Sequence, residues 1–241
     1  MTASFIPGKD ASLEASIQKL QTQLNKLDFH IIEQSWLNPI ANVWSVHIRD
    51  RDCPLLFTNG KGASQKAALA SALGEFFERL STNYFWADYY LGDSIAHAAF
   101  VHYPEERWFP ITGDKLPTGL LNPELDAFYN PEQSLTASML VDTNSGNSER
   151  GICALPFTRQ RDGVVTWIPV NIIGNLYVSN GMSAGNTPTE ARTQALSEIF
   201  ERSIKFRIIK EGLCLPTVPE VVIARYPKIA AGIAELRAAG F

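Results

Sequence analysis

A helix-like segment occurs twice in this chain, and this repeat constrains the fold more than any other feature of the sequence. The first copy covers residues 64–84, and the second begins at Thr187. When Glu75 is aligned with Glu198, both copies read A-L-x-E-x-x-E-R. Each copy follows a strand-like run and a glycine-bearing loop. The sequence therefore predicts two related strand–loop–helix units.

Each copy has the periodicity of a helix with one acidic face and one apolar face. Residues three and four apart share a face of an α-helix, which places Glu75 beside Glu78 and Glu198 beside Glu201. The apolar residues recur at the spacing of a helix that packs on a core. In the second copy they are Leu196, Ile199, Phe200 and Ile204. Either acidic face alone could be a solvated surface, but a duplicated unit that packs about a pseudo-twofold axis would bring both faces together.

Four carboxylates in one place need compensating charge. Two unit charges about 4 Å apart repel by roughly 4 kcal/mol at an effective dielectric near 20. Either several carboxyls are protonated or cations fill the site, and clustered carboxylates suit hard cations such as Mg²⁺. Di-iron sites need Glu-x-x-His on two helices, whereas arginine follows each glutamate pair here, at Arg79 and Arg202. We therefore expect the four glutamates to bind magnesium.

The two arginines indicate an anion at the same site. Each is either one half of an ion pair with the facing repeat or a contact for an anion held by the metal ions. Magnesium often binds through one or two carboxylates plus substrate phosphates, so a nucleoside triphosphate is the expected ligand. A glycine-bearing loop before a helix suits an anion at the helix N-terminus. Neither loop has the form G-x-x-x-x-G-K-[ST], which excludes a P-loop.

Four motifs give the chain a specific resemblance to the YcaO family. They are FIPGKDASLEASI, GEFFER, NGMSAGNT and SEIFER. The resemblance extends along the whole chain and implies an α+β fold with a pseudo-twofold repeat of strand–glycine loop–helix units, in which mixed or antiparallel sheets pack on helices. It also implies that ATP and magnesium ions bind between the pseudo-symmetric halves, with glutamates of the two helices as metal ligands.

The nucleotide contacts are implied by the resemblance, because the chemistry of the residues does not single them out. They are Lys9, Ser16, Ser183, Asn186, Glu190 and Arg202. Lys9 and Ser16 are otherwise ordinary surface residues. Glu190 completes a T-x-x-E capping box with Thr187, so capping and contact with the magnesium–nucleotide complex are equally supported. No general base or other catalytic residue can be identified.

Three interpretations of the function remain. In the first, the protein is an ATP-dependent enzyme that phosphorylates a peptide or protein amide oxygen, as the best-studied members of the family do. In the second, it is a non-catalytic, ATP-bound accessory protein, since one member is described as an accessory factor in β-methylthiolation of a small-subunit ribosomal protein. Its partners would then be a radical-type methylthiotransferase and that ribosomal protein, and a homodimer is one option for its assembly. In the third, the repeat is an old duplication with solvated glutamates and no ligand.

Composition excludes several other classes of protein. With 241 residues, of which 45% are hydrophobic, the chain can bury a substantial core. A net charge of −4 gives no electrostatic footprint for nucleic acid or for anionic membranes. No apolar run approaches the roughly 18 residues of a membrane span, and the N-terminus has no signal-peptide pattern. We therefore expect a cytoplasmic protein.

The remaining segments predict helices and strands around the repeats, which cover about residues 42–90 and 165–212. Helices are expected over 10–27 and 227–239, and strands over 29–36, 43–48, 54–57, 138–141, 152–157, 164–169 and 176–178. The proline-rich segment 104–131 is predicted to be an irregular connection between the halves. Because related proteins extend well beyond residue 241, we expect residues 1–241 to be the N-terminal portion of one YcaO domain.

Overall fold

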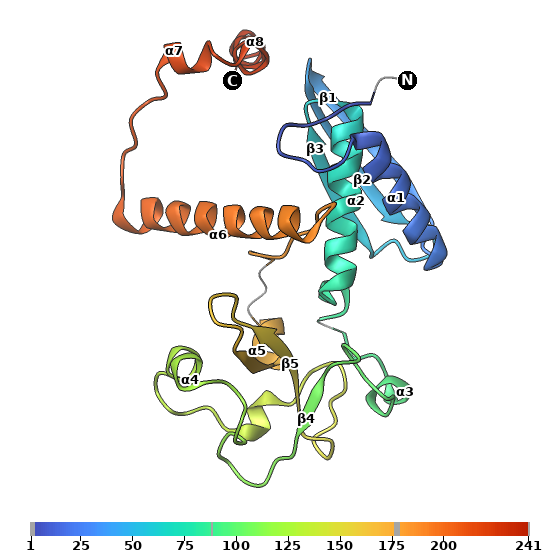
Figure 1. Cartoon of the computed structure of the whole chain (residues 1–241), viewed down its shortest axis with the longest axis vertical. Coiled ribbons are helices and arrows are strands. Elements are labelled where there is room, and N and C mark those ends of the chain that lie inside the picture. The colour runs from blue at the N-terminus through green and yellow to red at the C-terminus, as the bar shows by residue number, and fades with distance from the viewer. Residues whose placement is uncertain (1–2, 88, 176–178, 241) are drawn as a thin grey trace. The chain divides into compact units, whose positions relative to one another are not determined.

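The computed structural model describes residues 3–87, 89–175 and 179–240, and the chain divides into two compact units (Figure 1). Unit 1 comprises Met1–Thr82 and Ser179–Phe241, and unit 2 comprises Asn83–Val178. Both units combine helices with antiparallel sheet, so the predicted α+β class is confirmed. No helix formed by the described residues is both long and apolar enough to span a membrane.

Unit 1 contains a three-stranded antiparallel sheet with helices packed on it. The strands lie in the order β1 (Ile31–Ile40), β2 (Val43–Asp50) and β3 (Phe57–Gly62). Helix α2 (Gln65–Ser81) packs on β2 and β3, and α1 (Leu13–Lys26) packs against α2. Alternate residues of β2 face the helices, as expected for a sheet with one covered face. The largest fully buried side chains of this core are Leu24, Val46, Ile48, Leu73 and Phe76.

Two glycines of β3 allow the strand and α2 to approach closely. A Cβ atom on Gly60 would lie 1.9 Å from the carbonyl oxygen of Ala68, and one on Gly62 would lie 2.6 Å from the Cβ of Ala67. No side chain fits in this space, so glycine is required for packing. The first glycine-bearing segment is therefore a strand packed on a helix, and the prediction that it forms a loop is wrong.

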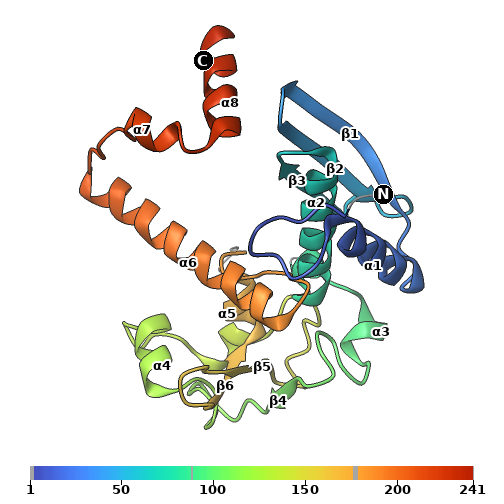
Figure 2. The same ribbon diagram turned by 45° about the horizontal axis from the view of Figure 1, so that its top comes forward.

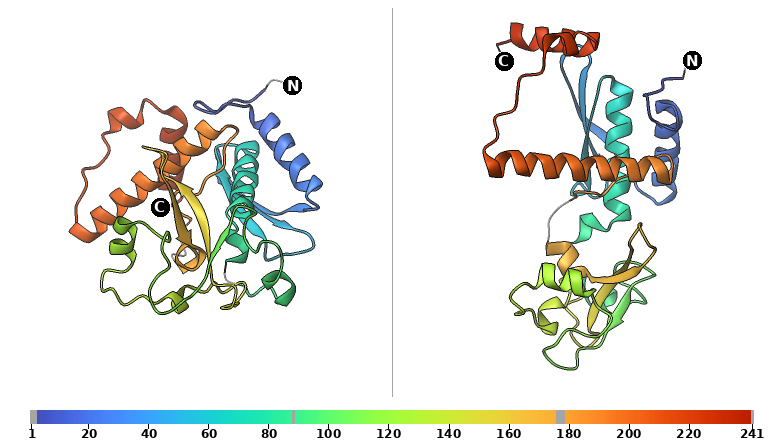
Figure 3. Two further views of the ribbon diagram at one scale, coloured as in Figure 1. Left: turned by 60° about the horizontal axis from the view of Figure 1, so that its bottom comes forward. Right: turned by 60° about the vertical axis from the view of Figure 1, so that its left-hand side comes forward.

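The chain returns to unit 1 after unit 2, and the second helix of the repeat lies in this returning part. Helix α6 (Pro188–Glu211) starts beside α2 and the N-terminal segment, and its C-terminal half extends away from them (Figure 2 and Figure 3). Its start is confirmed, because the Thr187 side chain accepts a hydrogen bond from the Glu190 N–H. Helices α7 (Glu220–Ile223) and α8 (Pro227–Ala238) follow.

The prediction that the apolar residues of α6 pack on a core is wrong for the described residues. Leu196, Ile199, Phe200 and Ile204 are all exposed. The reason is that, among the described residues, no sheet packs on this part of α6 as β2 and β3 pack on α2. The strand predicted at 176–178 lies outside the described residues, so the complete second unit and the pseudo-twofold repeat stay predictions.

Unit 2 has its own sheet and core. The strands β4 (Arg107–Phe109), β5 (Ile152–Thr158) and β6 (Val165–Pro169) form an antiparallel sheet in that order. The short helices around it are η1 (Tyr84–Trp86), α3 (Asp93–Ala96), α4 (Pro123–Tyr129), η2 (Ala137–Leu140) and α5 (Val170–Asn175). The buried core comprises Phe109, Leu120, Leu121, Ala137, Leu140, Ile152, Ala154 and Ile172.

Two sequence predictions for unit 2 need correction. Residues 138–141 were expected to form a strand, but they overlap the 3₁₀ helix η2, because the buried Ala137 and Leu140 are three positions apart and so lie on one side of such a helix. Segment 104–131 is less irregular than predicted, since it supplies β4 and α4. Asn122 caps α4 by accepting a hydrogen bond from the Leu125 N–H, a local signal that the proline content obscured.

Candidate functional site

The two glutamates of α2 share one arginine of the same helix. Nη2 of Arg79 lies 3.0 Å from Oε1 of Glu75, and Nη1 lies 3.0 Å from Oε1 of Glu78. The side chains of Arg79 and Glu78 are 13% and 11% exposed, whereas that of Glu75 is 36% exposed. One guanidinium group therefore joins two carboxylates in a part-buried environment, through a charge-assisted hydrogen bond to Glu75 and an ion pair with Glu78.

This arginine does not fully compensate the negative charge. Burial raises the pKa of Glu78 to about 7, Arg79 opposes that shift, and the charges of Glu198 and Glu75 add to it. Glu198 of α6 therefore lies close enough to α2 to act on Glu78 electrostatically. A carboxyl group whose pKa is raised by burial and by neighbouring carboxylates marks a place where an added cation would be stabilised.

Two other predicted site residues do not join this cluster. Glu201 and Arg202 are exposed on α6, and neither forms a hydrogen bond or ion pair with another described residue. Across the described parts of the chain, no three acidic, histidine or cysteine side chains form a ready metal-binding group. Magnesium often takes one or two carboxylates and completes its shell with phosphates and waters, which fits a site that is completed by its anionic ligand.

Four predicted nucleotide contacts lie together at the start of α6. Nζ of Lys9 is 3.1 Å from Oε1 of Glu190, and the Ser16 hydroxyl donates a hydrogen bond of 2.7 Å to Oδ1 of Asn186. Nδ2 of Asn186 in turn donates to both carboxylate oxygens of Glu190, at 3.2 and 3.0 Å. The fold thus brings the N-terminal segment against the loop before α6.

Glu190 does not act as the reciprocal partner of a capping box. Its carboxylate accepts a hydrogen bond of 3.1 Å from the backbone N–H of Asp10 and pairs with Lys9 and Asn186. Burial would raise the pKa of Glu190, but the hydrogen bonds from Asn186, Asp10 and Lys9 outweigh burial and lower it. The carboxylate is therefore ionised at neutral pH, and Thr187 supplies the cap with its own hydroxyl oxygen.

The loop that contains Ser183 is packed against α6. The Ser183 hydroxyl donates a hydrogen bond of 2.5 Å to the carbonyl oxygen of Ala191. A Cβ atom on Gly185 would lie 2.5 Å from the backbone nitrogen of Ala191, so the loop approaches the helix too closely for any other residue. In this conformation Ser183 holds the loop on the first turns of α6, while Asn186 bonds Ser16 and Glu190. We call Lys9, Ser16, Asn186 and Glu190 the Lys9 cluster.

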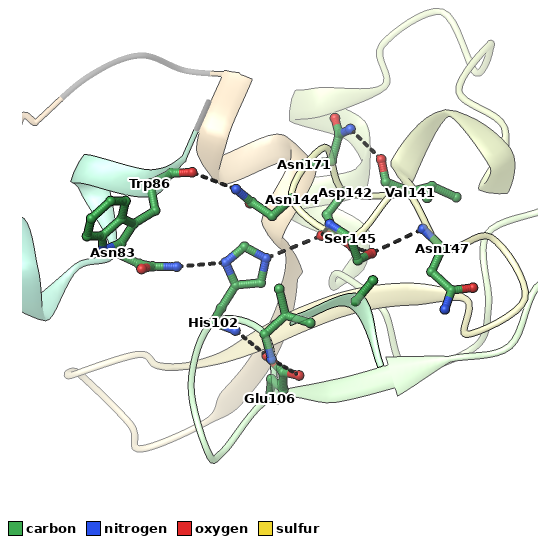
Figure 4. Close-up of polar contacts among 12 residues, drawn as sticks. Asn83, Trp86, His102, Glu106, Val141, Asp142, Asn144, Ser145, Asn147 and Asn171 are labelled. Atoms are coloured by element: carbon green, nitrogen blue, oxygen red, sulfur yellow. Dashed lines mark hydrogen bonds and ion pairs between the residues drawn. The ribbon is translucent and has the colours of Figure 1, made fainter. Parts of the chain in front are cut away.

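Sequence reasoning did not find a buried polar network in unit 2 (Figure 4). Asp142 accepts a 2.9 Å hydrogen bond from the Ser145 hydroxyl, and its other oxygen lies 3.4 Å from Nε2 of His102. Burial alone would raise the pKa of Asp142, but the hydrogen bonds from His102 and Ser145 hold it below its ordinary value. A hydrolytic triad places histidine between serine and carboxylate. Here the carboxylate is in the middle. Nδ2 of Asn83 also lies 2.9 Å from Nδ1 of His102, so the network holds three chain segments together.

Comparison with known proteins agrees with the resemblance found in the sequence. Residues 59–241 match the family described as YcaO cyclodehydratase, ATP- and Mg²⁺-binding. The ribosomal protein S12 methylthiotransferase accessory factor YcaO of Escherichia coli (strain K12) is 64% identical over 242 residues, covering 100% of this chain and 41% of that protein. An uncharacterized protein of Haemophilus influenzae is 61% identical over 239 residues, covering 99% of this chain and 41% of that protein.

Among solved structures, YcaO from Methanopyrus kandleri, bound with AMPPCP and Mg²⁺, matches with a TM-score of 0.54. The sequence identity is 16%, and the match covers 91% of this chain and 52% of that one, so this likeness supports the fold alone. The chain spans 41% of the length of the two relatives from E. coli and H. influenzae. Since the family match covers most of the chain, this protein belongs to the YcaO family, which is described as binding ATP and Mg²⁺.

Proposed function

We propose that unit 1 binds ATP and Mg²⁺ where α2, the start of α6 and the N-terminal segment meet. The observation that carries this proposal is that Glu75 and Glu78 share one part-buried arginine, Arg79, which lies 3.0 Å from each of them. The raised pKa of Glu78, caused by burial and by the charges of Glu198 and Glu75, is consistent with this shortage of positive charge. A divalent cation would relieve this uncompensated charge. The Lys9 cluster offers a cation for phosphate oxygens.

The proposed roles follow the two clusters. Magnesium would be held by Glu75, Glu78, Glu198 and Glu201. The nucleotide or its metal ions would be contacted by Lys9, Ser16, Ser183, Asn186, Glu190 and Arg202. Glu201 and Arg202 lie three and four positions after Glu198 on α6 and so share its face, from which they would join the site when an anion lies over that face.

The reaction we propose is transfer of a phosphoryl group to an amide oxygen of a peptide or protein substrate. ATP supplies the phosphoryl group and leaves as ADP. The contribution of this chain is to position the reactants and to neutralise charge, which is where most catalysis of phosphoryl transfer comes from. The name of the E. coli relative supports a role linked to methylthiolation of ribosomal protein S12. We propose that this modification is the β-methylthiolation of a small-subunit ribosomal protein and that it takes place in the cytoplasm.

The same name supports an alternative in which ATP is not consumed. Lys9 and Glu190 are 181 positions apart in the chain and are joined by a single ion pair, so a nucleotide at this place would strengthen the attachment of the N-terminal segment to α6. In this alternative, a partner methylthiotransferase performs the chemistry. For both functions we propose that residues 1–241 form the N-terminal portion of one YcaO domain with repeats at about 42–90 and 165–212.

Isothermal titration calorimetry on the full-length protein tests ATP binding. We expect binding that requires Mg²⁺ and is weakened about tenfold or more in Glu78→Gln, because a metal ligand is lost. Glu132→Gln, an exposed carboxylate of unit 2, is the matched control and should bind as the wild type does. Undiminished affinity in both Glu75→Gln and Glu78→Gln would overturn the site. ATP hydrolysis measured with and without a methylthiotransferase then separates the enzyme from the accessory protein.

A further inference from the structure

Arg79 and Arg202 occupy equivalent positions in the two copies of the motif but differ in their surroundings. Arg79 bridges Glu75 and Glu78 and is largely buried. Arg202 is exposed, with no ion pair to any residue that the structure describes. The two arginines therefore cannot perform the same task, and the paired one is built into the acidic face of α2.

The bridge made by Arg79 uses a different nitrogen for each carboxylate. Nη2 reaches Oε1 of Glu75 and Nη1 reaches Oε1 of Glu78, both at 3.0 Å. The two glutamates are thus tied to one rigid group. A planar guanidinium can hold two groups in a defined relation through separate nitrogens, whereas the ammonium of lysine is a single point charge.

Arg79 also contacts the loop that leads into α6. Its Nη1 lies 3.9 Å from Sδ of Met182. The same nitrogen that forms the ion pair with Glu78 therefore contacts the segment before the second acidic helix. Arg79 is in this way held between the carboxylates of α2 and the approach to α6, where Glu198 acts on Glu78.

We propose that Arg79 is a positioning residue for the magnesium site. It keeps Glu75 and Glu78 as a preformed pair of ligands for a divalent cation, and it acts through these glutamates without touching the substrate. The inference rests on the proposed function, because it assumes that the α2 glutamates bind Mg²⁺. It assigns the exposed Arg202, by contrast, to the nucleotide alone.

Two measurements on the full-length protein separate positioning from simple charge. The first is the Mg²⁺ concentration that gives half-maximal ATP binding, and the second is the Kd for ATP at saturating Mg²⁺. For Arg79→Lys, which keeps the charge but loses the fork, we expect the half-saturating Mg²⁺ concentration to rise about tenfold. The Kd for ATP at saturating Mg²⁺ should change less than about threefold, well below the roughly 10- to 100-fold loss of metal affinity that is typical when a residue supporting a metal ligand is mutated. Arg202→Lys is the matched control and should show the opposite pattern.

Arg79→Gln gives the sharpest contrast between the two explanations. If Arg79 were only a competing cation, its removal would tighten Mg²⁺ binding, whereas loss of positioning weakens it. Mg²⁺ binding in Arg79→Gln that equals or exceeds the wild type would overturn the inference. If Arg79→Gln does not fold, an unchanged half-saturating Mg²⁺ concentration in Arg79→Lys would overturn the inference instead. Failure of the wild type to bind Mg²⁺ and ATP would instead overturn the proposed function.

Discussion

Helices α2 and α6 carry the same A-L-x-E-x-x-E-R motif in contrasting surroundings. Leu73 of α2 is fully buried against the sheet, while the corresponding Leu196 of α6 is 54% exposed. Phe76 is likewise buried, and its counterpart Ile199 is 43% exposed. The motif therefore specifies a helix with an acidic and an apolar face in both places, and packing decides whether the apolar face is buried.

The contrast has an electrostatic consequence. Glu78 is buried beside a counter-ion and has a raised pKa, whereas its counterpart Glu201 is solvated and unpaired among the described residues. One copy is therefore a preformed half of the proposed site, and the other would be organised by its ligand. Two helices that share a sequence motif can in this way contribute unequally to one site.

The largest effect should come from disturbing the contact that buries α2. Gly60→Ala would place a methyl group 1.9 Å from the carbonyl oxygen of Ala68, so we expect a loss of at least about 3 kcal/mol in the free energy of unfolding. Gly74→Ala is the control, since nothing lies within 4 Å of its Cβ position and the change should stabilise α2 by roughly 0.5–1 kcal/mol. Urea denaturation measures both. Equal stability in the two variants would contradict the packing described here.

Truncating the leucines at equivalent positions of the two helices tests their difference in burial directly. Leu73→Ala removes a fully buried side chain and should cost about 2–5 kcal/mol. Leu196→Ala removes an exposed one and should change the free energy of unfolding by less than about 0.5 kcal/mol. Thermal unfolding of both variants in the full-length protein decides the point. A large loss of stability in Leu196→Ala would show that this side chain is buried in the full-length protein. The difference in burial between the two helices would then hold for residues 1–241 alone.

A smaller effect should appear in the pH dependence of stability without metal. Since the pKa of Glu78 is raised from 4.5 to about 7 in the folded state, the folded protein binds more protons than the unfolded chain between these values. Stability is then lost as pH rises from about 4.5 to about 7, by about 2 kcal/mol for this group after allowance for its partial screening. Glu78→Gln should remove this loss and be the more stable protein at pH 8.

Glu201→Gln is the matched control for this pH experiment. Because the Glu201 side chain is exposed, the variant should follow the wild type within about 0.5 kcal/mol at every pH. Denaturant midpoints at pH 5 and pH 8 suffice for the three proteins. Parallel curves for the wild type and Glu78→Gln would mean that Glu78 is not the uncompensated charge proposed here.

Local signals in the sequence were enough to place the helices that carry the site. The side chains of Ser64 and Thr187 cap α2 and α6 by accepting hydrogen bonds from backbone N–H groups of the first turn. The helical periodicity placed Glu75 and Glu78 on one face. The strand prediction failed at 138–141, where the short apolar run suits a 3₁₀ turn as well as a strand. Signals that act within one or two helical turns can be read without knowing the fold.

Other features were decided by tertiary structure alone. The pairing of Lys9 with Glu190, the need for glycine at position 60 and the raised pKa of Glu78 all depend on which distant segments share a volume. The sequence by itself determined two acidic helices and the resemblance that names their family. Which of the two helices is buried, and which arginine is paired, follows from packing, because desolvation and close contact are properties of the surroundings and are not encoded in a motif that occurs twice.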